Sequence, residues 1–238
     1  MHIFLNPGHH KIYDSGATNR RSGLRETDVA LAVSARAKNY LETAGVYVTE
    51  YQADDLGDIC TRANNSGADY FVSIHCNACN EVARGTEVEI YETCSVGAKL
   101  AQYIQDEIVA NLGTIDRGLK ERPGLYVLKH TAMPACLVEL AFIDNDEDAK
   151  LLVDREDDFA KALANGILTF AGYQKINSSS SQESSEYLTD PITQKPVLKE
   201  TGPNGKHFTK NDVDYLLSVG YTKADALAFL STDPKYKN

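Results

Sequence analysis

The sequence predicts an α/β fold: a mostly parallel, twisted sheet with helices on both faces, followed by a small, helical C-terminal module. Two observations support this prediction. Strand-like and helix-like segments alternate over residues 1–174, which is typical of a sheet whose parallel strands are joined by helices. A serine-rich stretch then separates this part from a shorter region of different composition.

Six segments in the first part are predicted to be strands. They are Ile3 to Asn6, Val46 to Tyr51, Asp69 to His75, Thr86 to Glu92, Leu125 to Leu128 and Cys136 to Phe142. Helical patterns lie between them, with apolar residues three or four positions apart. These patterns cover Thr27 to Thr43, Leu56 to Ser66, Gly97 to Leu112, and a last helix that carries Phe159, Leu163, Ile167 and Phe170.

The composition places a domain boundary near residue 175. Residues 175–186 are mostly serine, glutamine and glutamate, with almost nothing to bury, and they are predicted to form a flexible linker. We therefore expect a large first domain over 1–174, the linker over 175–186 and a small C-terminal module over 187–238.

A short repeat in the C-terminal module predicts two helices. Phe208 to Asp212 recurs thirteen positions later as Tyr221 to Asp225, and each copy contains Thr-x-x-Asp, a helix-start signature. Gly220 suits the stop between the two helices. Such a unit is small for independent stability, so it is expected to dock on the first domain, to self-associate, or to bind a ligand outside the chain.

Charge and apolar content exclude several classes of protein. The chain has 238 residues and a net charge of -10, which argues against nucleic acid as a partner. No run approaches the ~18 consecutive apolar residues that a membrane span needs. The chain opens on a strand-like run without the basic and apolar regions of an export signal, so we expect synthesis in the cytoplasm. The five cysteines are then expected to be reduced thiols.

Chemistry-bearing residues gather where the predicted strands end. The first strand runs into His9 and His10, the third ends at His75, and Glu139 lies inside an otherwise apolar strand. In open α/β sheets ligands bind beyond the carboxyl ends of the strands. A buried carboxylate needs a proton, a cation or a metal nearby, so histidines and a glutamate at one edge are typical of a metal site.

Simpler readings of the same residues remain open at this point. A histidine at a strand end is usually solvated or hydrogen-bonded at the surface. Glu139 could also be satisfied by an arginine such as Arg117 or Arg122.

Several short motifs occur in a fixed order between residues 2 and about 172. They are Asn6-Pro7-Gly8-His9, the Leu24 to Leu31 segment with Glu26, Arg62-Ala63-Asn64, Ser73 to Ala78 with His75, Leu125 to Leu128, and Pro134 to Asn145 with Glu139.

Together these motifs resemble the zinc-dependent N-acetylmuramoyl-L-alanine amidases of the Amidase_3 type. The resemblance implies that His9, Glu26 and His75 bind Zn²⁺ and that Glu139 is the catalytic glutamate. Without it, Glu26 would be read only as a favourable charge at a helix start. The family's first motif usually begins with aspartate and has glycine after the histidine, whereas this chain has Asn6 and His10 at those positions.

The resemblance also implies a reaction, a partner and a place of action. The substrate would be peptidoglycan, cut between N-acetylmuramic acid and L-alanine, with lysis of the cell wall as the result. The short route from Thr86 to Glu139 leaves little room for the plugging helix of some exported relatives, so an open site is expected. An open enzyme without an export signal would act at the wall after release, as a phage endolysin or a sporulation lytic enzyme does. The C-terminal module would then bind the wall.

Two other functions compete with this reading. A zinc peptidase would cut peptide bonds within the stem peptide, and it would not free the amino terminus of L-alanine. A non-catalytic module would have lost key residues, yet all four positions hold competent side chains.

Overall fold

The structure, a computed structural model, describes residues 1–176, 187–189 and 196–198. The chain divides into two compact units, Met1–Ile176 and Asn177–Asn238, and each is considered by itself. In the described part of the chain, every helix is too short or too polar to cross a membrane.

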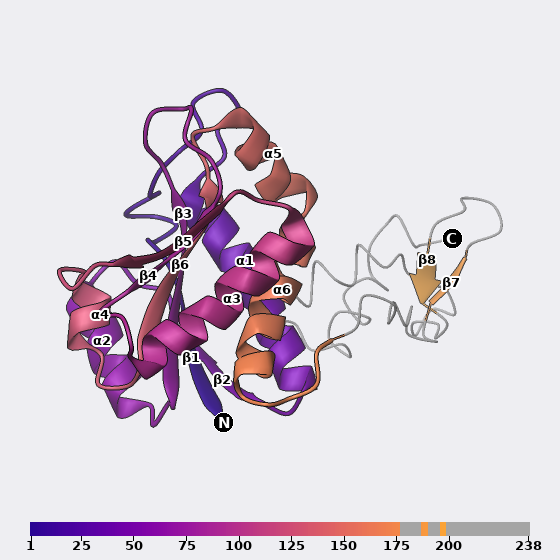
Figure 1. The fold of residues 1–238 in the computed structure, drawn as a ribbon. Helices are drawn as coiled ribbons and strands as arrows, with labels where there is room; N and C mark the ends of the chain where they lie inside the picture. The colour runs from indigo at the N-terminus through magenta and orange to yellow at the C-terminus, as the bar shows by residue number, and fades with distance from the viewer. Residues whose placement is uncertain (177–186, 190–195, 199–238) are drawn as a thin grey trace. The chain divides into compact units, whose positions relative to one another are not determined.

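A six-stranded sheet forms the centre of the first unit, in the order β2-β1-β3-β6-β4-β5 (Figure 1). Four neighbouring strands are parallel, and β4 runs antiparallel to β6 while β5 is parallel to β4. The strands are β1 (His2–Pro7), β2 (Tyr47–Glu50), β3 (Tyr70–Asn77), β4 (Thr86–Ile90), β5 (Asp116–Glu121) and β6 (Ala135–Phe142). The predicted mostly parallel sheet is confirmed.

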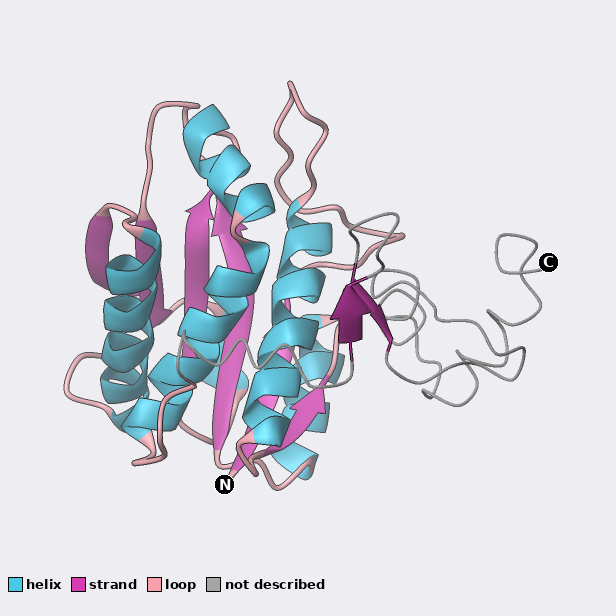
Figure 2. Ribbon diagram, turned by 90° about the vertical axis from the view of Figure 1, so that its right-hand side faces the viewer, coloured by secondary structure: helices cyan, strands magenta, loops and turns pink. Residues whose placement is uncertain are grey.

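Helices cover both faces of this sheet, as predicted (Figures 1 and 2). The larger layer packs on apolar side chains from all the central strands and consists of α1 (Glu26–Thr43), α3 (Val96–Leu112) and α6 (Glu156–Phe170). The smaller layer packs on Phe4, Phe71 and Leu137 and consists of α2 (Leu56–Asn65) and α4 (Tyr126–His130). An additional helix, α5 (Asp146–Asp154), follows β6.

The amphipathic spacing of the sequence explains the larger layer. Leu100, Ile104, Ile108 and Leu112 of α3 are all buried, and three of the four marked positions of α6 are fully buried. Side-chain caps fix where α2, α3 and α5 begin: Asp55, Ser95 and Asn145 each accept hydrogen bonds from the first turn.

One predicted strand is wrong. Leu125 to Leu128 was expected to be a strand, but Leu125 precedes α4 and the other three residues form its first turn; the strand that sequence analysis missed is β5. The apolar residues of this segment pack against α2 across one helical turn, so their burial does not require a strand. The sequence of β5, Asp-Arg-Gly-Leu-Lys-Glu, lacks an apolar alternation because it is a half-exposed edge strand, and Gly118 within it has a φ of 71°.

In the C-terminal unit the structure describes one short antiparallel pair of strands, β7 (Tyr187–Thr189) with β8 (Pro196–Leu198). The two helices predicted from the repeat at 208–212 and 221–225 lie outside the described residues.

A glycine sets the distance between α3 and α6. A Cβ atom at Gly166 would lie 2.6 Å from the Cα of Ile104. We predict that Gly166→Ala lowers the free energy of unfolding by about 1–2 kcal/mol, because overpacking against backbone outweighs the better helix propensity of alanine. Urea denaturation measures it, with Gly124→Ala as the control because a Cβ there meets nothing within 4 Å. An unchanged or higher stability of Gly166→Ala would contradict this account of the packing.

Candidate metal centre

The first side chain of the centre, His9, lies just beyond the end of β1. The backbone N–H of Gly8 donates to the carbonyl of Ile74 at 2.9 Å, which extends the pairing of β1 and β3 to the edge of the site. His9 then adopts a φ of 61°, a conformation that non-glycine residues seldom take, and turns its ring back over the sheet edge. The ring nitrogen Nε2 of His9 lies 3.0 Å from Oε2 of Glu26.

Glu26 is the first residue of α1, and its side chain is almost fully buried, with 4% of the residue exposed. Both carboxylate oxygens are held in place. Oε2 accepts from the backbone N–H of Ala17 at 2.8 Å, and Oε1 accepts from the backbone N–H of Cys76 at 3.0 Å. The carboxylate therefore cannot rotate away from the two histidines without losing these bonds.

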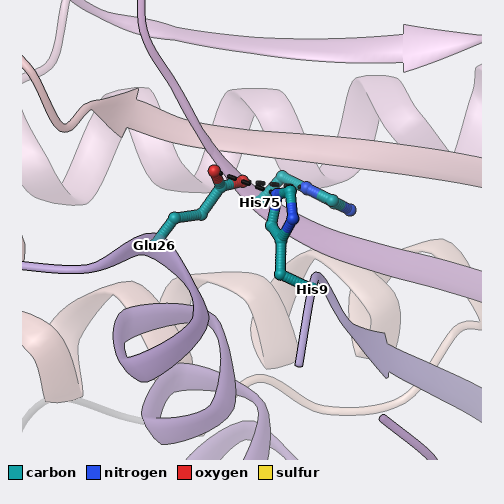
Figure 3. Close-up of side chains that lie close together, drawn as sticks. All are labelled: His9, Glu26 and His75. Carbon is teal, nitrogen blue, oxygen red and sulfur yellow. Dashed lines mark hydrogen bonds and ion pairs between the residues drawn. The ribbon is translucent and has the colours of Figure 1, made fainter. Parts of the chain in front are cut away.

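His75 comes from the end of β3, and its Nδ1 lies 2.8 Å from Oε1 of Glu26. The ring is packed against Gly8, where an added Cβ would lie 2.3 Å from the ring carbon Cε1. Glycine is required there for space, because any larger residue would displace the ring. Figure 3 shows both imidazoles and the carboxylate turned toward one another from three different elements.

These three residues could hold a metal ion. One ligand atom from each lies within 4.8 Å of the other two. Two ligands at about 2.0–2.1 Å from one ion are separated by about 3.3 Å in a tetrahedral shell, close to the two nitrogen–oxygen distances observed. The sequence left two adjacent histidines as candidates, and the structure brings His9, not His10, to Glu26.

The pKa shifts of His9 and Glu26 show that the site stabilises the charged forms of both side chains. The hydrogen bond with Glu26 raises the pKa of His9 to about 9; burial opposes this shift and Asp14 adds to it. Burial alone would raise the pKa of Glu26, but the hydrogen bonds from His75 and His9 outweigh it and hold that pKa well below its usual range. The site therefore favours a positive charge beside Glu26, which a bound cation would also supply.

Asp14 is a member of the site that the sequence analysis missed. Its Oδ2 lies 2.6 Å from Nδ1 of His9, and its Oδ1 accepts from the backbone N–H of Gly16 at 2.9 Å. Carboxylates in this position orient the ring of a metal-binding histidine. In the sequence, Asp14 is visible only as an aspartate five residues after His9. It reaches the ring of His9 because of a tight turn, which the sequence did not predict.

Glu139 lies in β6 directly beside His75 in the parallel register. The residue is half-buried, and its Oε2 is buried without a hydrogen-bond partner among the described residues. Burial raises the pKa of Glu139 to about 8, and the charges of Glu26, Glu89 and Glu87 add to the shift. A carboxyl group whose pKa lies close to the working pH is present in both its deprotonated and its protonated form, so it can take up a proton and return it.

The arginines offered as an alternative partner for Glu139 pair elsewhere. Arg117 Nε lies 2.8 Å from Glu87, and Arg122 Nε lies 2.9 Å from Glu89. Both glutamates belong to β4, where Glu87 stands opposite Glu139. The alternation Thr86-Glu87-Val88-Glu89-Ile90 already placed these two carboxylates on one face of a strand, so this feature was visible in the sequence.

Cys76 and Cys79 have the spacing Cys-x-x-Cys, but neither belongs to the cluster of possible ligands among the described residues. Cys76 is buried and burial raises the pKa of its thiol well above the usual value, whereas Cys79 is exposed. The backbone N–H of Cys76, and not its sulfur, contributes to the site by donating a hydrogen bond to Glu26.

The chain is similar in sequence and in fold to known amidases. The N-acetylmuramoyl-L-alanine amidase family of the Amidase_3 type matches residues 3–169. The N-acetylmuramoyl-L-alanine amidase LytC of Bacillus subtilis is 36% identical over 177 residues, which cover 71% of this chain but only 35% of LytC. The endolysin of Bacillus phage SPP1 is 30% identical over 236 residues, 94% of this chain and 85% of the endolysin.

A solved structure shows the same fold. The N-acetylmuramoyl-L-alanine amidase of Clostridium difficile 630 has a TM-score of 0.67 and 30% identity, and the match covers 72% of this chain and 96% of that one. With its sheet, its helical layers and its clustered His9, Glu26 and His75, the chain belongs to the N-acetylmuramoyl-L-alanine amidase family of the Amidase_3 type.

Proposed function

We propose that this protein is a zinc-dependent hydrolase of bacterial peptidoglycan that cuts the amide bond between N-acetylmuramic acid and L-alanine. The strongest support is the arrangement of four side chains. Ligand atoms of His9, Glu26 and His75 lie within 4.8 Å of one another, and Glu139, beside His75 on the neighbouring strand, has a buried oxygen without a hydrogen-bond partner among the described residues. Two imidazoles and one carboxylate suit Zn²⁺ and leave one position open for water.

Each residue then has a defined task. His9 and Glu26 would bind the ion together with His75, and Asp14 would keep the Nδ1 proton of His9 so that the Nε2 lone pair faces the ion. Zinc, when bound, acidifies water to a pKa near ~7 and polarises the amide carbonyl.

Glu139 would carry the proton. It takes one proton from the attacking water and returns it to the amide nitrogen, while the water oxygen bonds to the carbonyl carbon and the carbon–nitrogen bond breaks. The products are the free lactyl carboxylate on the sugar and a stem peptide with a free L-alanine amino group. Glu87 and Glu89, the neighbouring acids on β4, are each paired with an arginine.

The place of action proposed is the cell wall after release, as for an endolysin. The match to the SPP1 endolysin supports this choice because it extends over 94% of the chain, whereas the match to LytC covers 71%. The C-terminal unit is proposed to hold the enzyme on the wall, with self-association as the other role considered.

Two substitutions separate metal binding from proton transfer. Glu139→Gln should keep zinc at one ion per chain while losing at least about 100-fold in turnover of purified peptidoglycan, because the amide cannot carry the proton. His75→Ala should lose both zinc and turnover. Metal analysis and release of L-alanine amino termini measure the two effects, with the exposed Glu92→Gln as the matched control. Near-normal turnover by Glu139→Gln would refute the role of Glu139, and products lacking amino-terminal L-alanine would indicate the peptidase alternative.

The raised pKa of His9 predicts a pH dependence of zinc binding. The proton on His9 must leave before Nε2 can bind the ion, so binding releases a proton at any pH below about 9. The apparent association constant for zinc should rise up to about tenfold per pH unit and level off near pH 9. Chelator competition between pH 6 and 10 tests this, and a flat profile from pH 6 to 9 would contradict it.

Removal of the C-terminal unit tests its proposed role. The full chain should sediment with purified cell walls at moderate salt, because neither unit is basic enough for binding by charge alone, and residues 1–176 should remain in the supernatant. Equal sedimentation of the two proteins would remove the wall-binding proposal. The mass of each protein in solution shows whether the unit causes self-association instead.

A further inference from the structure

Residues 10–14 form a tight hairpin that begins immediately after His9. Backbone hydrogen bonds join His10 and Asp14 in both directions, at 2.9 and 3.0 Å. The carboxylate of Asp14 also lies 2.6 Å from the ring of His9. The tip of this hairpin is therefore short, braced and fixed next to the metal centre.

The tip carries two large apolar side chains into solvent. Ile12 is 79% exposed and Tyr13 is 76% exposed. The Tyr13 ring stacks on the ring of His10, with centroids 4.9 Å apart and an angle of 18° between the planes. One face of Tyr13 is thus supported and the other is open.

His10 has a structural task in this arrangement. Its ring lies against Tyr13, and its Nδ1 accepts from the backbone N–H of Ile12 at 3.4 Å, at the limit of a hydrogen bond. The histidine that takes the place of the family's usual glycine therefore supports the ring of Tyr13 and is not one of the three clustered side chains.

We infer that Ile12, Tyr13 and the supporting His10 form a contact surface for the sugar rings of the glycan strand. This inference rests on the proposed function. The bond that is cut joins a sugar to a peptide, so the substrate leaves the metal centre in two directions. The hairpin starts one residue from a proposed metal ligand, so a branch that leaves the centre on this side would contact it.

The chemistry of the surface selects the sugar branch. An open aromatic face beside an aliphatic side chain suits the C–H-rich face of a sugar ring, and aromatic rings provide a large contact area at a low cost in side-chain entropy. The stem peptide carries both acidic and amino groups and fits a different feature: a cavity of about 480 Å³ on the neighbouring loops, whose lining contains charges of both signs, among them Arg20, Arg21, Glu81 and Asp146. We therefore assign the charged stem peptide to this cavity and the sugar to the hairpin.

Substitution of Tyr13 tests the surface in the full, zinc-loaded chain. With a peptidoglycan fragment that carries a tetrasaccharide, Tyr13→Ala should raise KM about tenfold and leave kcat, zinc content and Tm unchanged, since the contact adds binding away from the reacting bond. Tyr13→Phe should behave like the wild type.

Tyr47→Ala is the matched control. Tyr47 is also an exposed tyrosine against a histidine, with its ring 4.4 Å from that of His2, but it begins β2 at the amino end of the parallel strands, away from the metal centre. Its KM should equal that of the wild type.

Titration with the peptide-free tetrasaccharide gives a reading that does not depend on catalysis. The wild type and Tyr47→Ala should bind it about tenfold more tightly than Tyr13→Ala does. Equal binding by all three proteins, no binding by the wild type, or an unchanged KM for Tyr13→Ala would overturn the inference. If the wild type binds the tetrasaccharide through Tyr13 but does not cleave peptidoglycan, the proposed hydrolysis is refuted and the inferred sugar-binding surface is retained.

Discussion

The carboxylate of Glu26 carries its charge in a place that water scarcely reaches. Leaving such a group unpaired would cost several kcal/mol, so the fold must supply partners for both oxygens. It does so from three directions at once, with the loop after β1, the backbone of residue 17 and the end of β3 all converging on the first residue of α1. Most features of the site follow from this single constraint.

The left-handed backbone of His9 is one consequence. The chain must turn sharply after Gly8 to bring the ring over Glu26, and a hairpin closed by Asp14 holds this turn. The glycine at position 8 is another consequence, because the ring of His75 reaches Glu26 only across the space that a side chain there would fill. A third is the pairing of nearby acids: Glu87 and Glu89 each form an ion pair with an arginine, whereas Oε2 of Glu139 is buried without a hydrogen-bond partner among the described residues.

The sequence predicted the α/β architecture well because burial in a parallel sheet and in amphipathic helices leaves strong periodic patterns, as in α3 and β6. It failed where the same apolar residues can be buried in two ways, as at Leu125 to Leu128, and where an edge strand is polar, as at β5. His9 and His75 could be predicted from their strand ends and Glu139 from its place inside an apolar strand, whereas Glu26 needed the family resemblance. Asp14 could not be found, since its partner is set by the geometry of a turn and not by periodicity.

The central claim is that His9, Glu26 and His75 form one zinc site with defined ligand atoms. Anomalous diffraction at the zinc edge from crystals of the metal-loaded protein tests it directly. The predicted result is a single peak about 2.0–2.2 Å from Nε2 of His9, a carboxylate oxygen of Glu26 and Nδ1 of His75. A peak bound through His10, or the absence of any peak between these three residues, would contradict the account.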